Sequence, residues 1–164
     1  MLVKSYLDAP IGCFEICGSA LGVRSVKRCE KPGVETQEIS DEHPVAVCKR
    51  ELRAYFDGKQ REFTVKLDWS GAPEFHRLVW AALQKIPYGE TVAYSDIANR
   101  IGQPKAVRAV GLANRNNPVA IVVPCHRVIG KAGELRGYFY GLDIKMALLR
   151  LENPVRFAEQ GSLF

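Results

Sequence analysis

Residues 95–115, SDIANRIGQPKAVRAVGLANR, hold two short segments with helical spacing of apolar residues, separated by a turn. Ser95 is placed to cap the first helix, which we expect to end at Ile101, one turn after Ile97. Gly102 then supplies the turn. The stretch therefore predicts a pair of short helices in the second half of the chain.

The second helix of this pair is expected over residues 104–115, with Pro104 at its first position. Its inward face carries Val107, Val110 and Ala113 or Asn114, and its outward face carries Lys105, Arg108 and Arg115. Two short helices around a glycine turn, the second of them basic, are typical of a helix-turn-helix that binds DNA. A purely structural pair of packed helices has the same periodicity and stays open as an alternative.

Charge and length narrow the class of protein. The 164 residues are enough for one domain or two small ones, and 47% hydrophobic with 25% charged residues is a globular composition. No stretch reaches the apolar length of a membrane span. The net charge of +5 lies wholly in residues 70–164, because residues 1–69 are neutral. A localised basic half fits a polyanionic partner, although a solvated basic face would have the same composition.

The first part of the chain reads as a small sheet with one covering helix. Strands are expected over residues 2–7, 12–17, 21–26 and 63–67, and a helix over 45–56. The turn-rich DWSGAP at 68–73 is the expected boundary, which gives domains at 1–69 and 70–164. The predicted fold class is α/β, with a mainly helical second domain.

Two further helices are expected in the second domain. The first covers residues 74–86 and is stopped by Pro87 and Gly89. The last covers 143–152 and has a predicted buried stripe of Ile144, Leu148 and Leu151.

The N-terminus and the cysteines indicate a reducing compartment. Asp8 interrupts the place where a signal peptide would be apolar, so we expect a cytoplasmic protein, or a nuclear one if the source is eukaryotic. An odd count of five cysteines argues against a disulfide framework. Cys13, Cys17 and Cys29 lack metal-ligand spacing and are expected to be buried apolar thiols, so no metal and no cofactor is predicted.

The segment 121–129, IVVPCHRVI, carries the candidate chemistry. Burial would make the Cys125 thiol inert, so a reactive cysteine needs a base or a positive field, for which His126 and Arg127 are candidates. Adjacent side chains diverge on an extended chain, so Cys125 and His126 need a turn or a bridging water. Glu152 borders the stripe of the last helix and would orient the imidazole, unless it is a solvated helix-end residue.

The motifs resemble one family, the O6-alkylguanine-DNA alkyltransferases, also called methylated-DNA–protein-cysteine methyltransferases. The resemblance is carried by PCHRV at 124–128, RAVG at 108–111, NP at 117–118, GY at 137–138, LLRLE at 148–152 and IPYGET at 86–91, and more loosely by LRAYFDG at 52–58. It implies a ribonuclease H-like N-terminal domain and a winged-helix-like C-terminal domain. It also implies an enzyme without a cofactor.

The resemblance further implies roles for individual residues. Cys125 would accept the alkyl group from O6 of guanine in one irreversible step, with His126 as base through water and Glu152 orienting it. Arg108 would enter the duplex from the minor groove and fill the space of the flipped nucleotide. Tyr94 would push at the 3′ phosphate and help to protonate guanine N3.

Other implied residues support these. Asn117 would hold the turn between the recognition helix and the active-site segment, and Tyr138 would pack against the extruded base. The implied DNA-contacting set is Tyr94, Lys105, Arg108, Ala109 and Arg115. The implied pocket set is Asn117, Pro124, Val128, Tyr138, Phe139 and Tyr140. The expected partner is double-stranded DNA carrying O6-alkylguanine, bound through the minor groove by a monomer, with cooperative assembly along DNA as a further expectation and no membrane.

The chain departs from the family at a few positions. Phe139 and Tyr140 replace small residues after Tyr138; they would narrow the alkyl pocket, or point outward and change nothing. Met146 replaces a frequent tryptophan, and Asn116 replaces a glycine in a turn that asparagine tolerates. Two other classes stay open: a damage-binding protein without transfer, against which Cys125 argues, and a thiol hydrolase built on Cys125, His126 and Glu152.

Overall fold

The structure is a computed structural model that describes residues 1–135 and 137–158. The chain divides into two compact units, one of residues 1–70 with 118–122 and one of residues 71–117 with 123–164. No helix in the described part is long and apolar enough to cross a bilayer.

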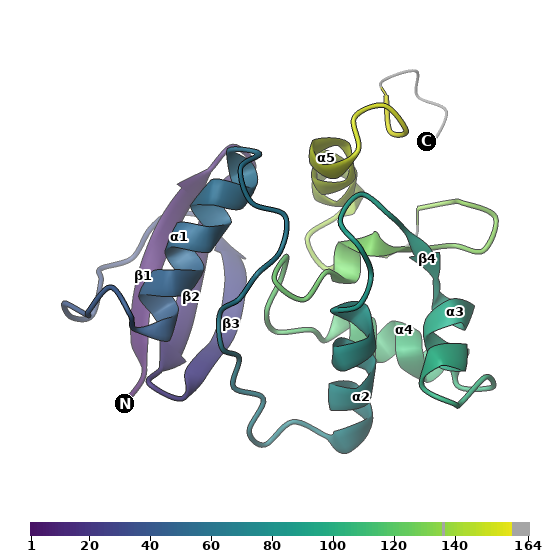
Figure 1. Cartoon of the computed structure of the whole chain (residues 1–164), viewed down its shortest axis with the longest axis horizontal. Helices are drawn as coiled ribbons and strands as arrows, with labels where there is room; N and C mark the ends of the chain where they lie inside the picture. Colours follow the sequence, from purple (N-terminus) through teal and green to yellow (C-terminus); the bar gives the residue numbers. More distant parts are fainter. Residues whose placement is uncertain (136, 159–164) are drawn as a thin grey trace. The chain divides into compact units, whose positions relative to one another are not determined.

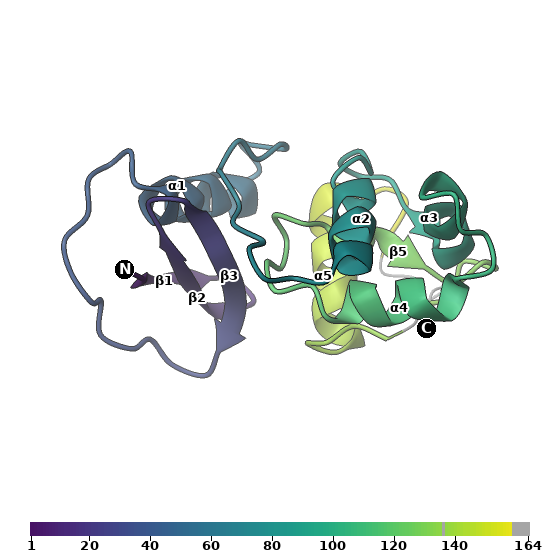
Figure 2. The same ribbon diagram turned by 90° about the horizontal axis from the view of Figure 1, so that it is seen from below.

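The first unit is an antiparallel sheet of β1 (Val3–Ala9), β2 (Gly12–Ser19) and β3 (Gly22–Cys29), in that order. The helix α1 (Pro44–Phe56) lies along one face of it (Figure 1, Figure 2). Alternating strand residues and one stripe of the helix form the core between them. Its fully buried members include Leu7, Phe14, Ile16, Val23, Val26, Val45, Leu52 and Tyr55.

The predicted fourth strand at residues 63–67 is wrong. Only Leu67 makes a bridge, to Val23, and it is parallel. The backbone N–H groups of Thr64 and Val65 donate instead to the buried carboxylate of Glu51 in α1, at 3.1 and 3.0 Å. A carboxylate that satisfies backbone donors replaces the ladder that a strand would need.

The segment 118–122 packs within the first unit. The N–H of Val26 donates to the carbonyl of Pro118 at 2.9 Å, and the N–H of Ala120 donates to the carbonyl of Val26 at 3.2 Å. Val26 and Val119 form a parallel bridge beside β3. This excursion of the chain was not anticipated from the sequence.

The second unit is mainly helical, as predicted, and contains α2 (Glu74–Leu83), α3 (Tyr94–Arg100), α4 (Val107–Arg115) and α5 (Leu142–Glu152). The helices α2, α3 and α4 pack on one another. A short parallel ladder joins β4 (Val92–Ala93) to β5 (Val128–Ile129), which follows a 3-10 turn, η1 (Cys125–Arg127). The expected mixed α/β fold with a helical second part is confirmed.

Several helix ends differ from the expectation. The helix α2 ends at Leu83 rather than Ile86, because the N–H groups of Lys85 and Ile86 donate to carbonyls three residues back instead of four. Ser95 does not cap α3; the Asp96 carboxylate instead accepts the N–H of Ala93 at 2.8 Å.

The helix α4 begins at Val107, not at Pro104, because residues 103–106 form a separate turn closed by the N–H of Ala106 on the carbonyl of Gln103. Val107 is consequently exposed rather than inward, whereas Val110, Ala113 and Asn114 are buried as predicted.

The buried stripe of α5 is also rotated from the expected one. It consists of Lys145, Met146, Leu148, Leu149 and Glu152, while Ile144 and Leu151 are only half-buried. Met146 and Leu149 pack with Ile129 and Phe157 in one apolar cluster.

Candidate functional site

Cys125 and His126 lie in one short turn. Pro124 begins the 3-10 helix η1, and the N–H of Arg127 donates to the Pro124 carbonyl at 3.0 Å. Cys125 is 6% exposed and His126 is fully buried. The backbone therefore adopts a turn here rather than an extended segment.

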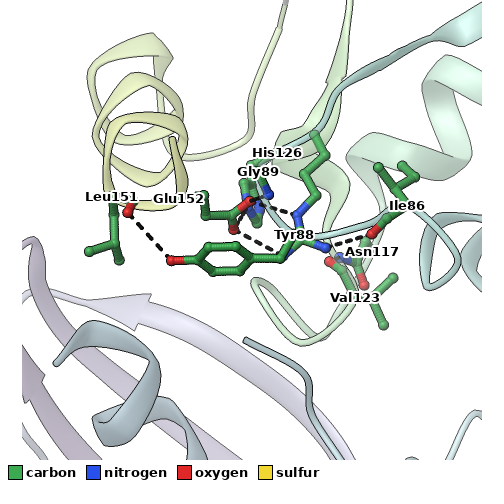
Figure 3. Close-up of polar contacts among 9 residues, drawn as sticks. Ile86, Tyr88, Gly89, Asn117, Val123, His126, Leu151 and Glu152 are labelled. Atoms are coloured by element: carbon green, nitrogen blue, oxygen red, sulfur yellow. Dashed lines mark hydrogen bonds and ion pairs between the residues drawn. The ribbon is translucent and has the colours of Figure 1, made fainter. Parts of the chain in front are cut away.

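A buried network fixes the imidazole of His126 (Figure 3). Nε2 of His126 lies 2.6 Å from Oε2 of Glu152, although the two residues are 26 positions apart in sequence. Glu152 is therefore not a solvated helix-end residue. Its side chain is fully buried, and the N–H of Gly89 also donates to its Oε1 at 3.2 Å.

Arg127 neutralises Glu152, a role that the sequence did not suggest. Its Nε and Nη2 donate to the two carboxylate oxygens at 2.8 and 3.0 Å, a bidentate pair, and its Nη1 donates to the carbonyl of Ile86 at 2.7 Å. The guanidinium also lies 5.7 Å from the ring centre of Tyr88, whose hydroxyl donates to the carbonyl of Leu151 (Figure 3). Arg127 thus fixes the Glu152 carboxylate, which in turn fixes the imidazole of His126.

The protonation states follow from burial and these contacts. Burial opposes ionisation of Glu152, but His126 and the permanent charge of Arg127 outweigh it and hold the pKa of Glu152 far below its ordinary value. Burial lowers the pKa of His126, only partly offset by Glu152. At neutral pH the arrangement is an ionised carboxylate beside a neutral imidazole.

The tautomer of that imidazole follows from its neighbours. An ionised carboxylate only accepts hydrogen bonds, so Nε2 of His126 carries the proton and Nδ1 carries the lone pair. Among the described residues, Nδ1 is buried and hydrogen bonds to no protein group. Nδ1 of His126 is therefore the ring atom that can accept a proton.

The thiol of Cys125 holds its proton. Burial raises its pKa, and a hydrogen bond from Asn117 and the charge of Lys145 only partly oppose this. The thiol is accordingly protonated in the protein alone, and a reaction at sulfur requires a base.

Asn117 connects the end of α4 to the active-site turn. Its Nδ2 donates to the carbonyl of Val123 at 2.9 Å and to Sγ of Cys125 at 3.2 Å. Asn114, in the last turn of α4, donates to the carbonyl of Cys125 at 3.4 Å. Contact of Asn117 with the sulfur and the contact of Asn114 were not anticipated.

Lys145 is a second residue that sequence reasoning missed. It is fully buried, and its Nζ donates to the carbonyl of Val128 at 2.6 Å. Burial lowers its pKa to about 8. A lysine in an amphipathic helix ordinarily indicates a solvated face, so nothing in the sequence marked it as part of the site.

The loop after residue 136 brings an aromatic cluster to the thiol. The hydroxyl of Tyr138 hydrogen bonds with Cys125, and burial raises the pKa of Tyr138 well above its ordinary value. Tyr140 packs edge-on against Tyr138 with ring centres 5.8 Å apart, and against Phe139 at 5.0 Å. Phe139 is 66% exposed, so only Tyr140 stays beside the ring that touches the sulfur.

The basic face of the helix pair is exposed. Arg108, Ala109 and Arg115 are exposed on α4, and Lys105 is exposed in the turn before it. Tyr94 begins α3, is half-buried, and its ring lies 4.0 Å from the position that a Cβ at Gly111 would take. The structure thus places Tyr94 against the helix that carries Arg108.

The chain matches two family models that together cover most of it. The ribonuclease-like domain of 6-O-methylguanine DNA methyltransferase matches residues 2–69, and the DNA binding domain of the same family matches residues 74–154.

Similar proteins are known as sequences and as structures. Two proteins named methylated-DNA–protein-cysteine methyltransferase are each 49% identical to this chain. The one from Methanosarcina acetivorans aligns over 88% of this chain and 94% of its own length. The one from Mycolicibacterium paratuberculosis aligns over 93% of both chains. The crystal structure of Mycobacterium tuberculosis O6-methylguanine methyltransferase is 41% identical with a TM-score of 0.79 over 94% of both chains. The same enzyme in complex with DNA is 45% identical with a TM-score of 0.78, over 91% of this chain and 92% of that one. The chain belongs to the 6-O-methylguanine DNA methyltransferase family, the methylated-DNA–protein-cysteine methyltransferases.

Proposed function

We propose that this protein repairs O6-alkylguanine in double-stranded DNA by transferring the alkyl group to Sγ of Cys125. The observation that carries the proposal is the buried Cys125 in the same turn as His126, whose Nε2 lies 2.6 Å from Glu152 and whose Nδ1 hydrogen bonds to no described protein group.

The transfer balances without a cofactor. The thiol proton passes through a water to Nδ1 of His126, and the sulfur attacks the alkyl carbon. The carbon–O6 bond breaks, its electron pair goes to the guanine ring, and a proton from Tyr94 neutralises the ring at N3. The products are guanine and a thioether, which no residue of the site can reverse, so each molecule acts once.

Access to the alkyl group requires that the nucleotide leave the base stack. We propose that α4 enters the minor groove and that Arg108 occupies the vacated space, since it is exposed on the helix that Asn114 and Asn117 connect to the active-site turn. The exposed cations Lys105 and Arg115 would contact phosphates. We propose that a monomer performs this reaction and that O4-methylthymine, which has the same kind of carbon–oxygen bond, is a slower substrate.

The test is intact mass spectrometry after incubation with a duplex containing O6-methylguanine. We expect a gain of one methylene group on Cys125, with one equivalent of guanine restored per molecule. Repeated turnover would indicate a hydrolase, and retained binding without a mass change would indicate a damage-binding protein. Cys125→Ala should bind the duplex without gaining mass, whereas Cys48→Ala, which alters another buried thiol, should react normally.

Nucleotide flipping has its own test. Arg108→Ala should slow transfer from duplex DNA much more than transfer from the free base O6-methylguanine, because only the duplex has a stack to open. Equal slowing with both substrates would contradict the assigned role of Arg108.

A further inference from the structure

Two cysteines of the first unit face each other across the sheet. Cys13 on β2 is the direct cross-strand partner of Cys29 on β3, and their Sγ atoms lie 2.8 Å apart. Both are free thiols. Direct antiparallel partners have Cα separations of about 4.5–5.5 Å, which falls inside the range of about 4.4–6.8 Å that disulfides require. A covalent bond between them needs no rearrangement of the strands.

The two thiols differ in accessibility. Cys13 is 5% exposed, whereas Cys29 is half-buried. Burial, the hydrogen bond with Cys29 and the nearby carboxylates of Asp8 and Glu15 raise the pKa of Cys13 to about 12. A thiol is nucleophilic only as its thiolate, so an oxidant from solution reacts first at Cys29, and Cys13 follows as the resolving thiol.

We propose that Cys13 and Cys29 form a redox modification site, at which a low-molecular-weight disulfide converts the two thiols into a cross-strand disulfide. The Cys29 thiolate attacks one sulfur of the small disulfide, whose S–S bond breaks and releases one small thiol. Cys13 then loses its proton and attacks the Cys29 sulfur, which releases the second small thiol. Two protein thiols are oxidised and one small disulfide is reduced, so atoms and electrons balance.

The first step also prepares the second. Once the Cys29 sulfur is in a mixed disulfide, it no longer donates to Cys13, and one of the causes that raise the pKa of Cys13 is removed. The Cys13 sulfur already lies against the sulfur it must attack. We therefore expect the mixed disulfide to be short-lived in the wild-type protein.

The bond would clamp the β2–β3 hairpin. It joins residues 16 positions apart and lies three residues beyond Val26, which hydrogen bonds to the 118–122 segment. Closing a loop of about this length constrains the unfolded chain, and we expect Tm to rise by about 5 °C or more. Cys125 takes no part, so the site is independent of alkyl transfer.

The experiment uses the full chain with oxidised glutathione as the probe. After incubation, free thiols are blocked with N-ethylmaleimide, and proteolytic fragments are identified by mass spectrometry. We expect a fragment pair that joins Cys13 to Cys29, a protein mass lower by two hydrogen atoms, and reversal by dithiothreitol together with loss of the gain in Tm.

Two variants sharpen the result. Cys13→Ser should trap glutathione on Cys29, because the resolving thiol is gone. Cys17→Ser is the matched control: Cys17 is another buried β2 cysteine, but its cross-strand partner is Ser25, so this variant should form the bond like the wild type. Glutathione retained on Cys29 of the wild type, a bond that involves Cys17 or Cys125 instead, or no reaction at Cys29 would overturn the proposal.

Discussion

Replacing Glu152 with glutamine tests the proposed base directly. Each carboxylate oxygen faces donors: Oε1 accepts from Arg127 Nε at 2.8 Å and from the Gly89 N–H at 3.2 Å, and Oε2 accepts from His126 Nε2 at 2.6 Å and from Arg127 Nη2 at 3.0 Å. An amide accepts at only one of these two places. In Glu152→Gln the amide NH₂ group therefore faces another hydrogen-bond donor in either orientation of the amide.

The less costly orientation disables the base. If the amide nitrogen takes the position of Oε1, it faces two donors that cannot change, Arg127 Nε and the Gly89 N–H. If it takes the position of Oε2, it faces only one such donor, Arg127 Nη2, because His126 can move its proton to Nδ1 and accept at Nε2. That tautomer has no lone pair at Nδ1. Loss of a positioned base slows a proton transfer by about 10²–10⁴, so we expect a fall of that order in the transfer rate. The buried charge of Arg127 also loses its partner, which costs about 3–5 kcal/mol of stability.

The assay measures the single-turnover rate of transfer from a duplex containing O6-methylguanine. The rate is divided by the folded fraction and measured at a temperature below the unfolding transitions of both the wild type and the variant. Glu51→Gln is the matched control, because Glu51 is a buried carboxylate that binds backbone donors in the other unit. It should lower Tm and leave the rate per folded molecule unchanged. A wild-type transfer rate in folded Glu152→Gln would refute the assignment of Glu152 as the residue that orients the base.

Three further predictions concern pH and pocket size. Burial lowers the pKa of His126 below 6.5, so the base stays neutral as pH falls through 6.5, and the transfer rate should decline only at lower pH; a midpoint at or above 6.5 in the pH–rate profile would contradict this. The pKa of Lys145 falls from 10.5 to about 8 on folding, so Lys145 should add roughly 3 kcal/mol to the free energy of unfolding as pH rises across that range, against the opposite contributions of Cys13 and Cys125, whose pKa values folding raises. Denaturant titrations should therefore show the wild type gaining stability relative to Lys145→Met as pH rises, and a constant difference between the two would contradict this. Tyr140 packs on Tyr138 beside the thiol, so Tyr140→Gly should be inactivated faster by benzylguanine than the wild type; equal rates would show that the ring does not narrow the pocket.

Local patterns predicted the elements whose stabilising contacts are local. The stripe of α1 placed that helix at 45–56, one residue from its observed start at Pro44. The strand expected at 63–67 failed because its backbone donors are satisfied by Glu51, which is 13 residues from Thr64. Periodicity reports which face is buried, but it does not report which group accepts a backbone hydrogen bond.

The same distinction separates the site residues that were predicted from those that were missed. The residue pattern left Glu152 open between an orienting carboxylate and a solvated helix-end residue, and the resemblance of LLRLE at 148–152 to the family implied the first. Arg127 was named only as a possible positive field for the thiol, and Lys145 was not named at all, because their observed contacts are with partners 25 and 17 positions away. Both are buried only because a carboxylate and a carbonyl meet them there.

The excursion at 118–122 lies between Asn117 and Val123, which Asn117 contacts. The segment belongs to the first unit and is held by β3, whereas Asn117 before it and Val123 after it belong to the second. The hydrogen bond from Asn117 Nδ2 to the Val123 carbonyl closes the base of this excursion at 2.9 Å, two residues before Cys125. Within it Ile121 has φ of 72°, a conformation that costs a β-branched residue about 1–3 kcal/mol and persists only when its surroundings impose it. The bonds of Val26 to Pro118 and Ala120 are such surroundings. The same Asn117 side chain also donates to Sγ of Cys125 at 3.2 Å, so one amide both closes the base of the excursion and contacts the sulfur.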